Sequence, residues 1–300
     1  MVNDVVSLLA EHYVDPEAAA AISRNLTASL AQGRYPAGEQ SLAQAVTADL
    51  QSVNGDKHLR LLYHADPLPE SKPDDDSAEY AAMEQWAAQT CYGIARVEHL
   101  PGNVGYLDIQ PVLFPATICG EAIAAAMTLL APAQALLIDV RHCRGGEPAA
   151  VALVCSYLLG PEPAELTGLY ERKGDRVRQS WTTPFVPGRR FGPVKPAYVL
   201  TSSASFSGAE ALAYDLQQLK RATIVGERTK GGAHAREGFR VHPHLEATIS
   251  VASAVNPVTG TNWEGTGVTP DVEVPAEQAR DRAHQLALDH LAKAGQDLDG

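Results

Sequence analysis

The segment from Tyr198 to Val225 reads as a strand, a serine-rich turn, a helix and a second strand, and its turn carries a candidate nucleophile. Ser207 stands at the expected start of the helix and is followed by the small residues Gly208 and Ala209. A hydroxyl there lies beside main-chain N–H groups that can stabilise an oxyanion, and small neighbours let a substrate carbonyl approach. The alternative is that a serine of this turn only caps the helix, as serines commonly do.

A second turn with main-chain donors follows the apolar run 135–140. Its glycine pair, Gly145 and Gly146, precedes Pro148, which suits the first turn of a helix. N–H groups at such a strand-to-helix turn can bind an anion. The turn lacks the spacing and the Lys-Ser/Thr ending of a nucleotide phosphate loop. A tight turn without a ligand remains the alternative.

A serine becomes a nucleophile at neutral pH when a base accepts its proton, and histidine is the usual base. The chain has ten histidines, so spacing alone does not choose among them. His58 follows a helix-stop signal at 54–55, and His234 follows a second glycine pair. His242 and His244 alternate as on one strand face, but no third ligand is evident, so neither a metal nor a cofactor is predicted.

Composition excludes several classes of function. The chain has 300 residues and a net charge of −12, and no Lys/Arg cluster stands out, so binding to nucleic acid through its phosphates is not expected. No apolar run is as long as a membrane span, and the first residues show no secretory signal, so we expect no membrane association and a cytoplasmic location. The four cysteines form no CxxC pair, which favours free buried thiols over a zinc site.

The elements that must position these residues fall into two parts. Residues 1–65 read as a helical subdomain, in which Asp15 caps a helix that begins with Pro16 and Ser41 can cap the next. Residues 66–77 are rich in proline and aspartate and read as a linker. From 78 to 300 strands alternate with helices, and an amphipathic helix comes last, which predicts an α/β fold with a helical appendage.

The motifs in combination resemble the S41 peptidase family, whose members include the tail-specific proteases. The resemblance covers more than half of the chain, with its motifs in the family's order. It rests on D-x-R-x-x-x-G-G at 139–146, the nucleophile segment at 207–210, a strand with a G-E-x-T turn at 221–229, and G-V-x-P-D at 267–271. The helical N-terminal part, which ends in Gly-Asp-Lys-His-Leu at 55–59, resembles that of the interphotoreceptor retinoid-binding protein subgroup.

The resemblance implies a ClpP/crotonase-like core of stacked β/α units with an N-terminal helical bundle. It implies Ser207 as the nucleophile, with an oxyanion hole formed by the N–H of Gly208 and one from Gly145 or Gly146. In the C-terminal processing branch the base is a lysine that follows the G-E-x-T turn. The aligned position here holds a glycine, and Lys230 lies two residues earlier, so a Ser/Lys pair is not expected.

A related enzyme class, the tricorn core protease, uses Ser, His and Glu. By that resemblance His58 takes the proton of the serine and Glu264 fixes the imidazole, while the serine that precedes the tricorn histidine is replaced by Lys57. His234 remains the alternative base. Processing peptidases usually carry a PDZ domain, but the stretch between His58 and Gly93 is too short to hold one.

We therefore expect a serine hydrolase that cleaves an amide or ester of a peptide or small acyl substrate through an acyl-enzyme on Ser207. A biosynthetic acyl-transferring or cyclising enzyme would form the same acyl-enzyme and differ in its access to water. A non-catalytic binder of an apolar ligand is the third reading, and the retention of Ser207, His58 and Glu264 argues against it. The sequence leaves the substrate open, and also whether the chain forms a homo-oligomer.

Overall fold

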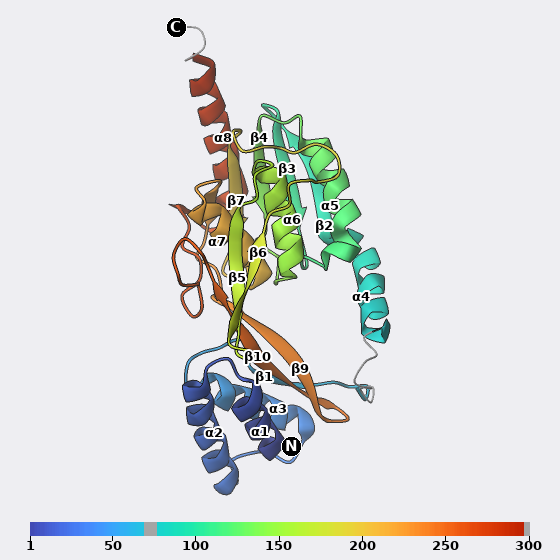
Figure 1. The fold of residues 1–300 in the computed structure, drawn as a ribbon, viewed down its shortest axis with the longest axis vertical. Helices are drawn as coiled ribbons and strands as arrows, with labels where there is room; N and C mark the ends of the chain where they lie inside the picture. Colours follow the sequence, from blue (N-terminus) through green and yellow to red (C-terminus); the bar gives the residue numbers. More distant parts are fainter. Residues whose placement is uncertain (69–76, 297–300) are drawn as a thin grey trace. The chain divides into compact units, whose positions relative to one another are not determined.

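The computed structural model describes residues 1–68 and 77–296, which form two compact units (Figure 1). Unit 1 combines Met1–Asp76 with two later segments, Gly168–Arg178 and Gly232–Val255. Unit 2 comprises the rest of the chain, Ser77–Thr167, Gln179–Gly231 and Asn256–Gly300. Most of the linker predicted at 66–77 lies outside the described residues.

Three helices open unit 1: α1 (Val2–His12), α2 (Pro16–Ala31) and α3 (Glu39–Gln51). The predicted cap of α2 is confirmed, because Asp15 Oδ1 accepts the N–H groups of Glu17 and Ala18, each at 3.0 Å. The prediction that Ser41 caps α3 is wrong. Gly38 is the N-cap, since its extended backbone starts the helix without a side-chain contact, and Ser41 Oγ donates instead to Gly38 O at 2.9 Å.

A sheet completes unit 1. Its strands are β1 (Arg60–Tyr63), β9 (His234–His242), β10 (Leu245–Val255) and the adjoining ends of β5 (Glu165–Glu171) and β6 (Arg176–Trp181). β10 pairs antiparallel with β1, β5 and β9. The apolar faces of the three helices pack into one core with Leu59, Leu61 and Ile249 of this sheet region. The N-terminal helices are therefore stabilised by strands that come from far along the chain.

Unit 2 is built on a six-stranded sheet in the order β11-β8-β7-β4-β3-β2. The strands are β2 (Ile94–Leu100), β3 (Val104–Ile109), β4 (Ala135–Asp139), β7 (Ala197–Thr201), β8 (Thr223–Gly226) and β11 (Val272–Glu273). β2 is antiparallel to β3, and the other pairs are parallel. All residues of β4 and β7 are buried, as expected for central strands covered on both faces.

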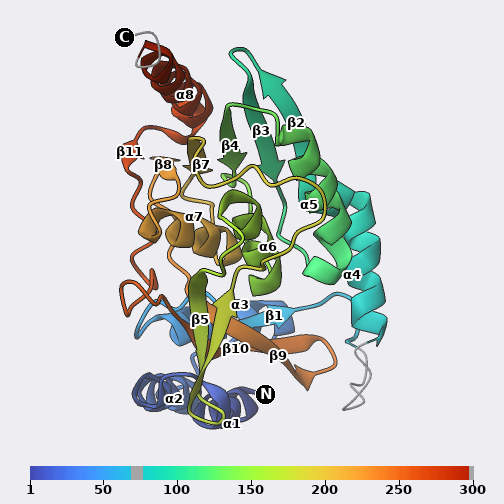
Figure 2. The ribbon, with the colours of Figure 1, turned by 45° about the horizontal axis from the view of Figure 1, so that its top comes forward.

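Helices cover the sheet of unit 2 on both sides (Figure 2). On one side the small residues Ala279, Ala283 and Ala287 of α8 (Ala279–Gln296) pack against the strands. The other helices of the unit are α4 (Ser77–Gln89), α5 (Ala116–Leu130), α6 (Pro148–Leu158) and α7 (Gly208–Gln218). Because β4 and β7 are parallel neighbours, the turns that follow them leave the sheet at the same edge. The fold thereby brings the two predicted glycine- and serine-bearing turns together.

The described helices and the cysteines can be compared with the composition of the chain. None of the helices in the part of the chain that the structure describes is both long and apolar enough to cross a bilayer. All four cysteines have free thiols, and Cys119, Cys143 and Cys155 are buried as predicted. Cys91 is exposed, because it lies in a short 3₁₀ turn (Cys91–Gly93) between α4 and β2 and not in the core.

Candidate active site

Ser207 joins the turn after β7 to α7 in a strained backbone conformation, with φ 52° and ψ −114°. Such a conformation costs a residue with a Cβ atom on the order of 1–3 kcal/mol and persists where the surroundings enforce it. A sharp strand-to-helix turn of this kind is how hydrolases expose a nucleophilic serine at the start of a helix. Ser207 is partly exposed, whereas Gly208, Ala209 and Glu210 are buried. The turn thus presents one hydroxyl next to buried main chain.

Glu210 holds this conformation in place. Its Oε2 accepts the N–H of Ser207 at 2.8 Å, and its Oε1 accepts Thr229 Oγ1 at 2.5 Å and the N–H of Gly231 at 2.6 Å. The side chain of Glu210 is fully buried, so these contacts are made away from solvent. The carboxylate therefore connects the turn that carries Ser207 with the G-E-x-T turn after β8.

The predicted glycines lie directly against Ser207. A Cβ atom on Gly145, whose φ is +130°, would lie 3.2 Å from Ser207 Cβ and 3.6 Å from Ser207 Oγ. A Cβ atom on Gly208 would lie 2.6 Å from the carbonyl oxygen of Gly146. Gly208 is also the first residue of α7, and N–H groups of a first helical turn have no acceptor within the helix. The structure thus brings Ser207 together with all three glycines predicted for an oxyanion hole.

Two other serines of the turn, Ser202 and Ser205, join it to the turn after β4. Ser202 Oγ donates to the carbonyl of Arg141 at 2.6 Å, and Ser205 Oγ donates to that of Val140 at 2.8 Å. Both serines are buried. Their hydroxyls therefore have structural acceptors, which distinguishes them from the partly exposed Ser207.

The Asp and Arg of the D-x-R motif stabilise the same edge of the sheet. Arg141 donates from Nε and Nη2 to the buried carboxylate of Asp139, with Nη2 at 2.6 Å from Oδ2, and Tyr106 Oη donates to it at 2.7 Å. Nη1 of Arg141 reaches the carbonyl of Ala276. A forked guanidinium–carboxylate contact fixes geometry as well as charge. The motif thus holds the turn with Gly145 rather than supplying a reacting group.

Lys230 and Glu264 also belong to unit 2. The ammonium of Lys230 lies 4.8 Å from the ring centroid of Phe206, the residue before Ser207. The N–H of Glu264 donates to Asn262 Oδ1 at 2.8 Å in the loop that follows β10. That loop packs against the turn at Gly231, since a Cβ there would lie 2.9 Å from the N of Gly267. Glu264 is therefore part of the segment that contacts the Glu210-bound turn.

The two candidate bases, His58 and His234, lie in unit 1 and share one carboxylate. His234 Nδ1 lies 2.7 Å from Asp56 Oδ2, and His58 Nδ1 lies 3.8 Å from Asp56 Oδ1. The N–H of His58 donates to Asp56 Oδ1 at 2.9 Å, and its carbonyl accepts Thr248 Oγ1 at 2.6 Å. The His234 ring thus lies within hydrogen-bond distance of Asp56, and the main chain of His58 is fixed by Asp56 and Thr248.

Burial sets the protonation of this group. Burial lowers the pKa of His58, the charge of Asp56 raises it, and positive charge on His234 lowers it, with a net result of about 4. Burial raises the pKa of Asp56, but the hydrogen bond and charge of His234 and the contacts of Ser250 and the His58 N–H lower it to about 2. At neutral pH the His58 ring is therefore a neutral imidazole beside an ionised carboxylate.

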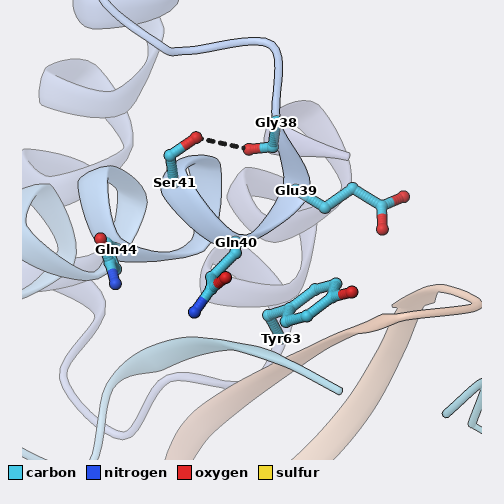
Figure 3. Close-up of a pocket in the computed structure, with 6 residues that line it drawn as sticks. All are labelled: Gly38, Glu39, Gln40, Ser41, Gln44 and Tyr63. Atoms are coloured by element: carbon cyan, nitrogen blue, oxygen red, sulfur yellow. Dashed lines mark hydrogen bonds between the residues drawn. The ribbon is translucent and has the colours of Figure 1, made fainter. Parts of the chain in front are cut away.

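The remaining histidines singled out by spacing do not share a strand face. His242 ends β9 and lies 2.9 Å from Glu39 Oε1, whereas His244 lies in the turn and its Nδ1 contacts the carbonyl of His64. A nearby surface pocket is lined by Gly38, Glu39, Gln40, Ser41, Gln44 and Tyr63 (Figure 3). The residues that line this pocket include no histidine, and the hydroxyl of Ser41 donates to the carbonyl of Gly38. The pocket therefore does not contain a Ser/His arrangement.

Three residues with contacts to candidate site residues lie within the sequence motifs but were not predicted as site residues: Glu210 and Thr229 of unit 2, and Asp56 of unit 1. Glu210 could have been found from the S-x-x-E spacing with Ser207, the pattern of a helix capping box. Asp56 precedes His58 by two residues, a spacing that places a carboxylate near a histidine main chain. The role of Thr229 depends on the packing of a distant turn and has no local signal.

Comparison with known proteins was consistent with these motifs. Residues 103–274 match the model of peptidase family S41, and residues 1–94 match the model of the N-terminal domain of this family in eukaryotic IRBP. A curated relative, the chloroplastic C-terminal processing peptidase of Tetradesmus obliquus, is 23% identical over 235 residues, which is 77% of this chain. The chain spans 49% of the length of that relative.

Solved structures with the same fold include the photosystem II D1 C-terminal processing protease and the tricorn protease. The first has a TM-score of 0.55 at 17% identity and covers 92% of each chain. The second has a TM-score of 0.63 at 13% identity and covers 97% of this chain and 36% of tricorn. At these identities the likeness concerns the fold, and it agrees with the predicted α/β architecture with a helical N-terminal part.

Proposed function

Because the chain belongs to peptidase family S41, we propose that it is a serine peptidase whose nucleophile is Ser207. The observation that carries the proposal is the strained Ser207 backbone, φ 52°, at the start of α7, next to Gly145, where an added Cβ would lie 3.2 Å from Ser207 Cβ. A hydroxyl held in this conformation beside glycine N–H groups suits attack on a carbonyl and stabilisation of the resulting oxyanion.

The proposed reaction has two steps. Ser207 Oγ bonds to the substrate carbonyl carbon while a base takes its proton, and the amine or alcohol then leaves with that proton. The acyl-enzyme ester is next attacked by water, which releases the acid and restores the serine. The N–H of Gly208 and one from Gly145 or Gly146 would bind the oxyanion in both steps, and each such donor contributes about 10²–10³ in rate.

We propose that His58 of unit 1 is the base and that Glu264 orients its ring, in line with the tricorn resemblance. The His58 pKa of about 4 keeps the imidazole neutral at pH 7, as a proton acceptor must be. A base with so low a pKa is weak, so the proposal requires that the developing imidazolium be stabilised when substrate binds. His234, which has the direct carboxylate contact, is the second candidate.

The proposed substrate is a polypeptide, since the two processing enzymes that the chain resembles are named for cleavage near a C-terminus. An acyl-transferring or cyclising enzyme would use the same acyl-enzyme with an amine or alcohol in place of water. A non-catalytic binder of an apolar ligand would not need the strain at Ser207, which favours the two enzyme alternatives.

A fluorophosphonate probe separates these alternatives. We expect wild-type protein and Ser205→Ala to be labelled and Ser207→Ala not to be labelled, because the buried Ser205 Oγ donates to the carbonyl of Val140 and accepts the N–H of Ser202. Protein that is folded but not labelled, and that takes up a fluorescent apolar ligand, would contradict the proposal and support the binder. Among labelled proteins, product analysis with peptide substrates in the presence and absence of added amine distinguishes hydrolysis from acyl transfer.

A further inference from the structure

The carboxylate of Asp56 is the common acceptor of four groups in unit 1. Its Oδ2 accepts Tyr13 Oη at 3.0 Å, Ser250 Oγ at 2.8 Å and His234 Nδ1 at 2.7 Å. Its Oδ1 accepts the N–H of His58 at 2.9 Å. Asp56 is 1% exposed, and a buried carboxylate remains ionised only where such donors compensate for the lost water.

These donors come from separate segments of unit 1. Tyr13 lies between α1 and α2, His234 begins β9, and Ser250 lies in the middle of β10. The position of Asp56 is therefore set by the fold of the whole unit rather than by its own loop. A charge fixed in this way can orient the groups that contact it without cost at the moment of reaction.

We propose, on the basis of the function proposed above, that Asp56 is a positioning residue that orients the imidazole of His234 and fixes the main chain that carries His58. Because Asp56 is ionised, His234 Nδ1 is the donor in their contact, which leaves Nε2 as the acceptor in the neutral ring. Both candidate bases of the acyl-transfer reaction thereby depend on one carboxylate.

The same carboxylate influences the charge on His58. The groups that act on this ring include Asp56, which raises its pKa, and His234, Arg236 and Arg60, which lower it together with burial. Removal of the Asp56 charge takes away the stabilisation that this carboxylate gives to the imidazolium. The ring should then be a still weaker base, and the main chain of His58 should lose an ionised acceptor for its N–H.

Asp56→Asn tests the proposal through the rate and pH dependence of fluorophosphonate labelling. We expect a rate on the order of 10²-fold lower and a midpoint of the pH profile shifted downward, because general-base catalysis contributes about 10²–10⁴. The matched control is Asp49→Asn, which loses the contact of a carboxylate with Tyr35 Oη at 2.7 Å in the same unit and touches no histidine. Unchanged rate and midpoint in a folded Asp56→Asn protein would overturn the proposal.

A second measurement on the wild-type protein does not depend on the folding of a variant. In protein with ¹⁵N-labelled histidine, the nitrogen shifts of neutral His234 should report a proton on Nδ1, and a proton on Nε2 would overturn the proposed orientation. Failure of the proposed function is distinct, since wild-type protein would then not be labelled at Ser207 while the His234 tautomer would be unaffected.

Discussion

The carboxylate of Glu210 accepts the main-chain N–H of Ser207 at 2.8 Å, three residues back along the chain. The same carboxylate accepts Thr229 and Gly231 from the turn after β8. The N–H of Ser207 is thus occupied, and the strained serine is anchored at a point where two turns meet. The N–H of Ser207 is therefore not among the proposed oxyanion donors, which are the glycine N–H groups, and Glu210 fixes the main chain of the proposed nucleophile.

Glu210→Gln should lower both stability and reactivity. The glutamine places an NH₂ group against at least one N–H or O–H donor that now contacts a carboxylate, and a buried unsatisfied donor costs about 1–3 kcal/mol. We expect a loss of that size in the free energy of unfolding, measured in urea, together with slower probe labelling. Glu227→Gln is the control, because Glu227 accepts Ser203 and Ala276 N–H groups and does not contact Ser207. Equal effects of the two substitutions on labelling would argue against a specific role of Glu210.

Gly145→Ala should slow labelling by about 10²–10³-fold while the protein still folds. The added Cβ would lie 3.2 Å from Ser207 Cβ at a φ of +130°, so the turn must shift and displace its N–H. Loss of one oxyanion donor lowers the rate by about 10²–10³. Gly160→Ala is the matched control, since its Cβ would have no atom within 4 Å. If Gly145→Ala is labelled at the wild-type rate, this turn does not form the oxyanion hole.

The base assignment can be tested by comparing His58→Ala, His234→Ala and Lys230→Met. We expect His58→Ala to lose labelling almost completely, and Lys230→Met to retain it because that ammonium lies over the Phe206 ring. His234→Ala removes a partner of Asp56 but leaves the proposed base, His58, in place. The labelling of His234→Ala should therefore be slowed less than that of His58→Ala. Loss of labelling only in His234→Ala would show that His234 is the base, and loss only in Lys230→Met would indicate a Ser/Lys pair.

Asp215 of α7 should make stability depend on pH. Its Oδ1 accepts the N–H of Thr167 at 2.9 Å, Thr167 Oγ1 at 2.7 Å and Asn256 Nδ2 at 3.1 Å, but burial raises its pKa to about 6. A carboxyl group with a raised folded-state pKa costs stability above that pKa and recovers it as the pH falls. The cost is on the order of 3 kcal/mol at pH 7.

Urea unfolding of wild type and Asp215→Asn at several pH values measures this contribution. The free energy of unfolding of wild type, taken relative to the variant, should rise as the pH falls from 7 to 4. If the difference in free energy of unfolding stays constant from pH 7 to 4, or decreases as the pH falls, the burial of an ionisable Asp215 is contradicted.

Local sequence patterns predicted most of the elements, including the strands that became β4 and β7, while the grouping of Ser207 with the glycines was implied by the family resemblance. The structure adds that β4 and β7 are parallel neighbours, which brings the turns that follow them to one edge of the sheet. Asp15 and Pro16 placed the start of α2 because a cap and an N1 proline act within one turn. The ClpP/crotonase likeness and the cytoplasmic location remain predictions.

Long-range pairing could not be predicted in the same way. β1 and β11 are short, and β9 has largely exposed or partly buried residues, so none gives a clear period of two. The inclusion of 168–178 and 232–255 in unit 1 depends on β10 pairing with β1, β5 and β9. The Asp56–His234 contact joins residues 178 positions apart, and no local spacing reports it.

Identification of the labelled residue tests the central claim most directly. Wild-type protein treated with a fluorophosphonate and digested should yield one phosphonylated peptide, with tandem mass spectrometry placing the adduct on Ser207. An adduct on Ser202, Ser203 or Ser205, or folded protein with no adduct, would contradict the assignment of Ser207 as the nucleophile.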